Sequence, residues 1–332
     1  MSEDKVSKAM PVDVYFGGNF WGHPDSEQAG KQILIHKKFR WGDENWYIPA
    51  VYLCDAGLVM DFCVEKEPEE LQAFIDKWDL YHENQNHYSE EQYEQMDAEN
   101  PLSFHAQPGV IVNGVELRRS FGCGISWIPK SCLKEGMACD EEARVLLEHY
   151  QLDPLKGWKL WRGKFLWTDS GADFPDIRTL QVRLEPEPIS VPGIHFSGLK
   201  TGESVSFIHP GTGISHTLTM RSCEQAELTG QQIPDWEGEF PRYYQVVTYQ
   251  ILPEAERGEI SIFDCENGDR PKNSRNRANG STAVFVAGSS RVSEYRVACS
   301  SLYFNPVQDV EWRIVFQLKD REEIEVDLGG LQ

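Results

Sequence analysis

The chain has 332 residues, of which 40% are hydrophobic and 11% aromatic, and its formal net charge is −21. This apolar content excludes a disordered chain, and the length favours two domains that each bury a core. The negative charge disfavours nucleic acid and anionic membranes as partners, because phosphate groups are bound by clustered Lys and Arg side chains.

The first residues do not predict a secretory signal peptide. Residues 1–10 are polar and charged and lack the apolar core of a signal peptide. No run approaches the ~18 consecutive apolar residues that a membrane-spanning helix needs. The eight cysteines are scattered along the chain, which favours reduced thiols over a disulfide framework. We therefore expect a cytoplasmic protein.

Strands are predicted for residues 12–21, 33–41 and 46–64, which are rich in β-branched and aromatic residues. The last of these runs reads as a hairpin that turns at residues 55–57. Pro68 then opens a predicted helix, in which apolar residues recur at helical spacing. These residues are Leu71, Phe74, Ile75 and Trp78.

Two more helices and a hairpin complete the first half. Ser89 and Gln92 have the spacing of a capping box and predict a short helix. Asn113-Gly114, between two β-branched triplets, predicts a hairpin, and Asp140 is placed to cap a further helix. The first half is therefore expected to be an α+β domain.

The second half contains short predicted strands separated by turn residues, without helical periodicity. The expected strands are residues 180–184, 194–199, 203–208, 216–220, 243–252, 259–263, 282–287, 296–304, 310–318 and 322–328. This spacing favours a sandwich or a barrel, and we expect an all-β antiparallel sandwich-like domain. The expected domains are residues 1–178 and 179–332, joined by a proline-rich linker over residues 170–192.

Charge is unevenly distributed. Residues 65–99 hold 12 Asp or Glu against Lys66 and Lys77, a net charge of −10. A solvated helical surface explains such a run best, and an interaction face for a basic partner is the alternative. Residues 270–280 form a basic, loop-like segment, which reads as a surface loop or as a docking segment for the acidic region of another copy.

His209 and His216 are candidate binding residues because they flank a tight turn. If Gly211-Thr212 forms the loop, Phe207, His209 and His216 share one strand face and the imidazoles are diagonal neighbours. A metal would need a third ligand, and none is visible nearby in sequence, so buried rings bonded to the backbone are favoured.

Trp161 and Trp167 are candidate binding residues for a sugar or a peptide, although strand alternation favours a core role for that face. Paired carboxylates could hydrolyse glycosides, but 53 Asp and Glu make some pair inevitable. No C-x-x-C, nucleophile-elbow, phosphate-loop or zincin motif is present, so we assign no catalytic residue, no metal ligand and no cofactor.

Three stretches, residues 205–219, 283–288 and 299–313, together resemble a family of uncharacterised bacterial proteins. The resemblance covers only the C-terminal half and implies a bacterial origin, without an activity or site residues. The sequence favours a non-catalytic binding or protein-interaction protein, possible self-association included. The alternative is a hydrolase that acts on carbohydrate through paired carboxylates.

Overall fold

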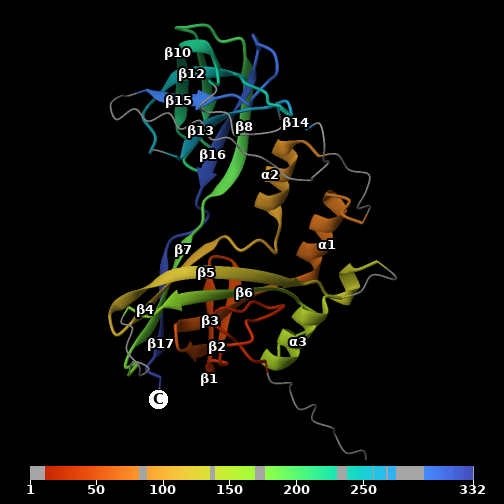
Figure 1. The fold of residues 1–332 in the computed structure, drawn as a ribbon, viewed down its shortest axis with the longest axis vertical. Helices are drawn as coiled ribbons and strands as arrows, with labels where there is room; N and C mark the ends of the chain where they lie inside the picture. Colours follow the sequence, from red (N-terminus) through yellow and green to blue (C-terminus); the bar gives the residue numbers. More distant parts are fainter. Residues whose placement is uncertain are drawn as a thin grey trace, which may run out of the picture. The chain divides into compact units, whose positions relative to one another are not determined.

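The computed structural model describes residues 12–81, 88–134, 139–168, 176–229, 238–256, 258–266, 268–273 and 295–331 (Figure 1). The chain is β-rich, and all its sheets are antiparallel. It divides into two compact units. The first contains residues 1–86, 99–188 and 319–332, and the second contains residues 87–98 and 189–318. No described helix is long and apolar enough to cross a membrane.

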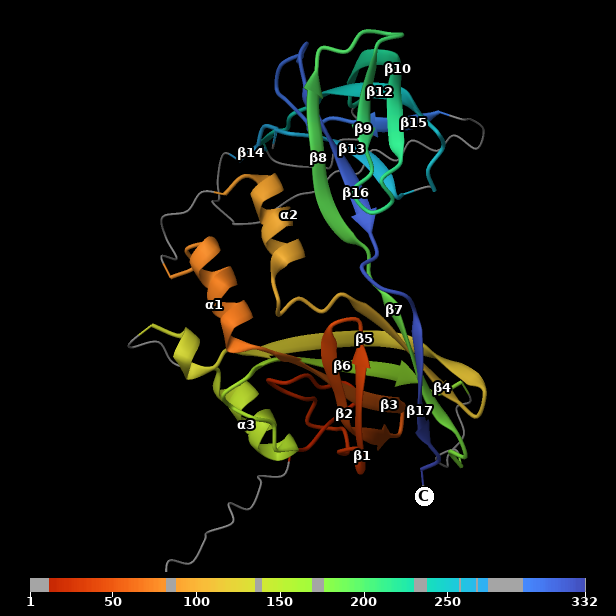
Figure 2. The same cartoon turned by 180° about the vertical axis from the view of Figure 1, so that it is seen from behind.

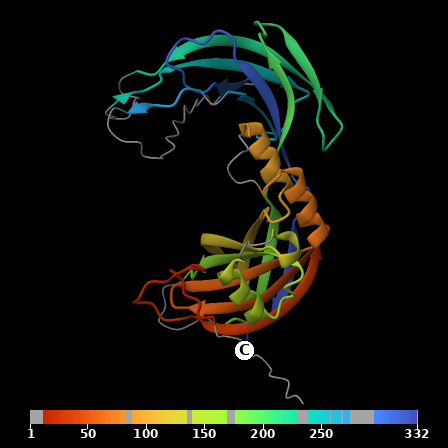
Figure 3. The same cartoon turned by 90° about the vertical axis from the view of Figure 1, so that its right-hand side faces the viewer.

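An eight-stranded sheet in the order β1-β2-β3-β6-β5-β4-β7-β17 forms the first unit (Figures 1 and 2). Its strands are β1 (Lys31–Trp41), β2 (Glu44–Cys54), β3 (Gly57–Lys66), β4 (Ala106–Val112), β5 (Val115–Trp127), β6 (Gly157–Leu166), β7 (Leu180–Pro186) and β17 (Ile324–Gly329). The red and orange strands bend strongly in Figure 3. At one end of β1 the Trp41 indole donates a hydrogen bond to the carbonyl of Glu322, just before β17, at 2.7 Å. The sheet is therefore nearly closed into a barrel.

Both faces of this sheet are buried at β2 and β3. One face encloses a core that includes Ile48, Leu58 and Phe165. The other packs against α3 (Glu141–Tyr150) and the segment that leads into β1. This two-sided burial explains why β2 and β3 are almost continuously apolar instead of alternating. A third, smaller cluster joins α1 (Pro68–Lys77) to the short 3-10 helix Lys130–Cys132.

Glu44 links β2 to the approach of β17. Its carboxylate accepts a hydrogen bond from Lys66 at 2.5 Å and another from Arg321. Burial alone would raise the pKa of Glu44, but the hydrogen bonds and charges of these two cations outweigh it, so the pKa is lowered. The near-closure of the barrel therefore includes a partly buried ionic group.

Two sheets that share one core form most of the second unit. They have the orders β15-β12-β10-β9 and β13-β16-β8, and a pair β11-β14 stands apart. The strands are β8 (Ile189–Ser197), β9 (Ser204–Ile208), β10 (Ser215–Glu227), β11 (Gly238–Glu239), β12 (Tyr243–Leu252), β13 (Ile260–Asp264), β14 (Lys272–Asn273), β15 (Arg296–Cys299) and β16 (Glu311–Leu318). Leu218 and Val247 from the first sheet meet Ile314 from the second. Residues 90–98 of α2 (Glu90–Glu99) belong to this unit.

The local predictions of helix starts and of one hairpin are confirmed. Asn113-Gly114 connects β4 to β5, and Pro68 stands at the start of α1. Ser89 and Gln92 exchange the two hydrogen bonds of a capping box, at 2.8 and 3.2 Å. The Asp140 carboxylate accepts from the Ala143 amide at 2.9 Å at the start of α3.

Several strand predictions differ from the structure, and one lies outside it. The strand expected over residues 194–199 is β8, which begins at Ile189, so the segment 170–192 expected as a linker contains β7 and the start of β8. Residues 12–21 form bends and irregular backbone, because the Asn19 side chain accepts from the amides of Trp21 and Gly22 and holds a turn. The strand expected over residues 296–304 ends at Cys299. The strand expected over residues 282–287 and most of the basic segment 270–280 lie outside the described residues.

The division into units also differs from the boundary expected at residue 178. Strand β7 pairs with β4, and β17 pairs with β7, so both strands complete the sheet of the first unit. Leu180, Val182 and Leu184 point their side chains into the first core. Alternation along a strand reveals that one face is buried, but it does not reveal which sheet the strand joins.

Candidate ligand-binding pocket of the first unit

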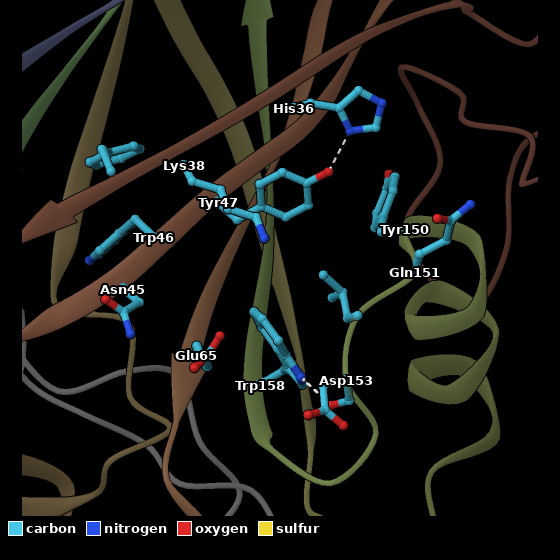
Figure 4. A pocket seen from close by; sticks show the side chains of 12 residues that line it. His36, Lys38, Asn45, Trp46, Tyr47, Glu65, Tyr150, Gln151, Asp153 and Trp158 are labelled. Atoms are coloured by element: carbon cyan, nitrogen blue, oxygen red, sulfur yellow. Dashed lines mark hydrogen bonds between the residues drawn. The ribbon is translucent and has the colours of Figure 1, made fainter.

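A pocket of ≈ 730 Å³ opens where β1, β2, β3 and β6 meet the C-terminal end of α3 (Figure 4). This volume lies within the range of small-molecule sites, about 300–1,000 Å³. We call it the aromatic pocket. Its lining residues are His36, Lys38, Phe39, Asn45, Trp46, Tyr47, Glu65, Tyr150, Gln151, Leu152, Asp153 and Trp158.

Buried apolar side chains form the floor of the aromatic pocket. Tyr47, Tyr150, Leu152 and Trp158 are each less than one-tenth exposed. The Trp158 indole donates a hydrogen bond to the carbonyl of Asp153 at 2.8 Å, which fixes the ring (Figure 4). The floor therefore offers rigid aromatic surface whose own polar groups are already satisfied.

Polar side chains of both charges form the rim. His36, Lys38, Asn45, Gln151 and Asp153 are exposed, and Glu65 is half-buried. Such a rim can donate and accept hydrogen bonds in several directions around a ligand that rests on the floor.

His36 occupies an unusual backbone conformation. Its φ is 50°, and the register between β1 and β2 shifts between Leu34 and Lys37. A side chain rarely adopts this left-handed region within a strand, and bulges of this kind commonly re-aim a side chain beside a binding site. Here the bulge brings His36 Nδ1 to 2.6 Å from the Tyr47 hydroxyl (Figure 4).

The Tyr47 hydroxyl is able to donate that hydrogen bond. Burial, with a smaller contribution from Cys63, raises the pKa of Tyr47, so the phenol keeps its proton. In the His36 tautomer that accepts this bond at Nδ1, the Nε2–H points to a second partner and can donate to a ligand at the rim.

A buried ionic network supports the pocket from behind. The Tyr150 hydroxyl donates to Asp61 Oδ2 at 2.5 Å, and Asp61 accepts two hydrogen bonds from Arg162, each at 2.7 Å. Tyr52 lies 2.6 Å from Tyr150, oxygen to oxygen. Burial and the charge of Asp61 raise the pKa of Tyr150 well above its usual value, so Tyr150 stays a hydrogen-bond donor. The network fixes the Tyr150 ring.

Two carboxylates line the pocket in different settings. Asp153 Oδ1 accepts a hydrogen bond from the Leu155 amide at 2.9 Å and so holds the turn after α3. The Glu65 carboxylate has no hydrogen-bond or ion-pair partner among the described residues. Glu65 is therefore the better placed of the two to contact a ligand.

The tryptophans singled out from the sequence lie in the first unit but do not line this pocket. Trp161 stacks on Phe104, with ring centroids 4.9 Å apart and planes at 5°, and packs against the barrel core. It also lines a smaller pocket of ≈ 330 Å³ beside Phe121. The Trp167 indole donates to the carbonyl of Cys54 at 3.0 Å.

The two histidines singled out from the sequence lie in the second unit, far from solvent. The hairpin has the register considered above, with Phe207 opposite His216, and the imidazole centroids are 6.2 Å apart. His209 Nδ1 accepts from the amides of Gly211 and Thr212, and His216 Nδ1 lies 2.8 Å from the carbonyl of Pro253, to which it donates. These bonds occupy both Nδ1 atoms with backbone groups, as a structural role requires.

Sequence reasoning missed the residues of the aromatic pocket because they come from four strands and a helix end. The one local signal is the pairing of β1 with β2, which brings Lys38 opposite Tyr47. The bulge that aims His36 at Tyr47 has no sequence signature. No protein-family model, curated protein or solved structure matches this chain.

Proposed function

We propose that this protein is a non-catalytic binding protein whose first unit binds an uncharged saccharide in the aromatic pocket. The observation that carries the proposal is the combination of a rigid aromatic floor with a polar rim of both charges. Sugars present apolar C–H faces and hydroxyl groups that both donate and accept hydrogen bonds, which is the complement of this lining.

The charges around the pocket favour a neutral ligand. Lys38 carries a positive charge at the rim, and Glu65 and Asp153 carry negative charges. A strongly anionic ligand would meet two carboxylates and a chain of net charge −21, and a strongly cationic one would meet Lys38. A neutral polyhydroxylated ring avoids both penalties.

The rigidity of the lining supports binding. Tyr150 is held by Asp61, Trp158 by the Asp153 carbonyl and Tyr47 by His36. Side chains that are already ordered lose little conformational entropy when a ligand binds, so more of the contact energy appears as affinity.

We regard the first unit as an α+β domain that carries the ligand site, and the second as a sandwich-like domain, supported by the core that its two sheets share. A partner protein or self-association stays a prediction of the sequence.

Titration of a saccharide panel into the purified protein tests the proposal, followed by calorimetry on any sugar that binds. Asn45→Ala and Lys38→Ala each remove a rim hydrogen bond, worth about 0.5–1.5 kcal/mol, so each lowers affinity roughly 2- to 10-fold. Lys31→Ala, at the other end of β1 and also exposed, is the matched control and leaves affinity unchanged. Absence of binding across the panel, or equal effects of all three substitutions, contradicts the proposal.

A carbohydrate hydrolase is the second candidate, because the carboxylates of Glu65 and Asp153 line one pocket. The engagement of Asp153 in a turn and its exposure argue against a general acid, which needs a desolvated carboxyl group. Release of new reducing ends from a bound glycan, abolished by Glu65→Gln, would favour the hydrolase. Binding without turnover favours the binding protein.

A further inference from the structure

A cluster of metal-ligating side chains lies on the outward face of the β13-β16-β8 sheet in the second unit. Trp312, Ile314 and Phe316 of β16 point into the core, so Glu311 and Arg313 project from the opposite face. His195 on β8 stands across from Arg313, and the Cys265 amide donates to the Glu311 carbonyl at 2.9 Å. Three adjacent strands thus bring an imidazole, a thiol and a carboxylate together.

Two of the three separations between these ligand atoms are close to those of a tetrahedral zinc site. His195 Nδ1 is 3.2 Å from Glu311 Oε1 and 3.7 Å from Cys265 Sγ, and the ligand atoms of the three residues lie within 4.8 Å of one another. Tetrahedral zinc with ordinary bond lengths requires about 3.3 Å between nitrogen and oxygen ligands, and about 3.6 Å between sulfur and either of them. Zinc binding would therefore bring the Cys265 sulfur and the Glu311 oxygen to about 3.6 Å from each other.

The second nitrogen of His195 has the partner that zinc-binding histidines commonly have. Nε2 is 3.0 Å from Glu91 Oε2 on α2. A carboxylate at this position orients the imidazole, keeps the proton on Nε2 and leaves Nδ1 free to coordinate a metal.

Arg313 does not oppose a cation at this cluster. Its guanidinium, on a side chain that is 2% exposed, makes two hydrogen bonds to Glu94, at 2.5 and 2.8 Å. Glu94 is one helical turn from Glu91, so the same face of α2 supplies both carboxylates. The charge of Arg313 is therefore compensated beside the cluster.

We propose that His195, Cys265 and Glu311 form a zinc-binding site with Glu91 as the outer partner of the histidine. Binding exchanges the Cys265 thiol proton for a zinc–sulfur bond, and the proton goes to solvent. His195 and Glu311 are partly exposed, so the fourth position is open to water or to an exogenous ligand. A thiolate, an imidazole and one carboxylate suit zinc, whereas magnesium and calcium prefer oxygen ligands throughout.

The same contacts have one competing explanation. A doubly protonated His195 that donates to Glu91 and Glu311 would need no metal, and Cys265 would then take no part. The role of Cys265 therefore separates the two explanations.

The site is independent of the aromatic pocket. Its three ligand residues are 46 or more positions apart in sequence, so no short sequence motif contains them.

Metal titration of the full-length protein, after removal of bound metal with a chelator, tests the site. We expect one equivalent of zinc to bind. With cobalt as a spectroscopic substitute, we expect the near-ultraviolet charge-transfer band of a cobalt–thiolate bond. Cys265→Ser abolishes this band and lowers zinc affinity at least ~10-fold, and Glu91→Gln lowers it about 10- to 100-fold. Cys223→Ser, at an exposed cysteine of the same unit, is the matched control and keeps wild-type behaviour.

Glu311→Gln is a second variant for the case that Cys265→Ser does not fold, because it changes an exposed side chain. We expect it to weaken zinc binding as well. Circular dichroism checks the fold of each variant. The proposal is overturned if the wild-type protein binds no stoichiometric zinc, or if zinc affinity is the same in Cys265→Ser, Glu311→Gln and Cys223→Ser.

Discussion

Replacing Asp61 by Asn tests the buried network behind the aromatic pocket. The Asp61 carboxylate accepts hydrogen bonds from Arg162 Nε and Nη2 and from the Tyr150 hydroxyl. Asp61 and Arg162 are 3% and 2% exposed, so neither charge has water to stabilise it. The substitution keeps the shape of the side chain but leaves the Arg162 charge without its counter-ion.

The expected cost follows from this burial. Breaking a buried ion pair by removing one partner destabilises a protein by about 3–5 kcal/mol, because the remaining charge stays desolvated. Removing both charges, as in Asp61→Leu with Arg162→Met, costs much less than the single substitution, since no unpaired charge remains. Tyr150 then keeps its contact with Tyr52.

Urea denaturation of the wild-type protein, of Asp61→Asn and of the double variant Asp61→Leu with Arg162→Met measures these differences in the free energy of unfolding. Asp43→Asn, which removes a fully exposed ion pair with Arg40, is the control and has little effect. Because Tyr150 lines the pocket, Asp61→Asn also weakens saccharide binding. A loss below about 1 kcal/mol for Asp61→Asn, typical of surface pairs, would refute the argument that the pair is buried and mutually required.

Three further substitutions test local features of the first unit. Because the pKa of Glu44 is lowered in the folded protein, this group stabilises the fold above its ordinary pKa of 4.5 and loses that contribution as the pH falls. Glu44→Gln should therefore reduce the loss of stability on the acid side of a stability–pH profile. An unchanged acid side contradicts this argument. Gly163→Ala would place a Cβ 2.4 Å from the Trp161 ring. Such overpacking should lower the free energy of unfolding, measured by urea denaturation, by about 1–3 kcal/mol. An unchanged free energy of unfolding would contradict the packing of Trp161 against the core. Gln151 ends α3 with φ 55°, a left-handed conformation that glycine adopts more easily. Gln151→Gly should therefore raise the free energy of unfolding, measured by thermal denaturation, by about 1 kcal/mol. A lower free energy of unfolding would contradict the left-handed cap.

Local chemistry made part of the fold predictable. The hairpin and two helix starts are set by hydrogen bonds between residues close together in sequence, so sequence spacing alone locates them. The residues concerned are Asn113-Gly114, Asp140 and the Ser89–Gln92 pair. Strand partners depend on contacts across the whole chain. For this reason the sequence predicts β7 in the second domain, whereas it pairs with β4 and β17 in the first unit. Its alternating Leu and Val residues fit either core equally well.

The candidate sites were less predictable than the fold. Trp161 and the His209–His216 pair stand out in the sequence because residues of the same type lie nearby. In the structure Trp161 stacks on Phe104, and the two histidines hydrogen-bond to backbone groups. The aromatic pocket and the His195 cluster are assembled from residues that only strand pairing brings together. The acidic run over residues 65–99 favours a solvated surface, but its Glu91 and Glu94 contact His195 and Arg313.

The most direct test of saccharide binding uses the indole N–H signals of the 10 tryptophans in a proton–nitrogen correlation spectrum. Trp46 and Trp158 line the aromatic pocket, whereas Trp161 and Trp167 do not, and Trp→Phe substitutions assign the four signals. A saccharide that binds is predicted to shift the Trp46 and Trp158 signals in a saturable manner and to leave the Trp161 and Trp167 signals in place. Shifts confined to Trp161 and Trp167, or no saturable shift with any saccharide, would contradict the account.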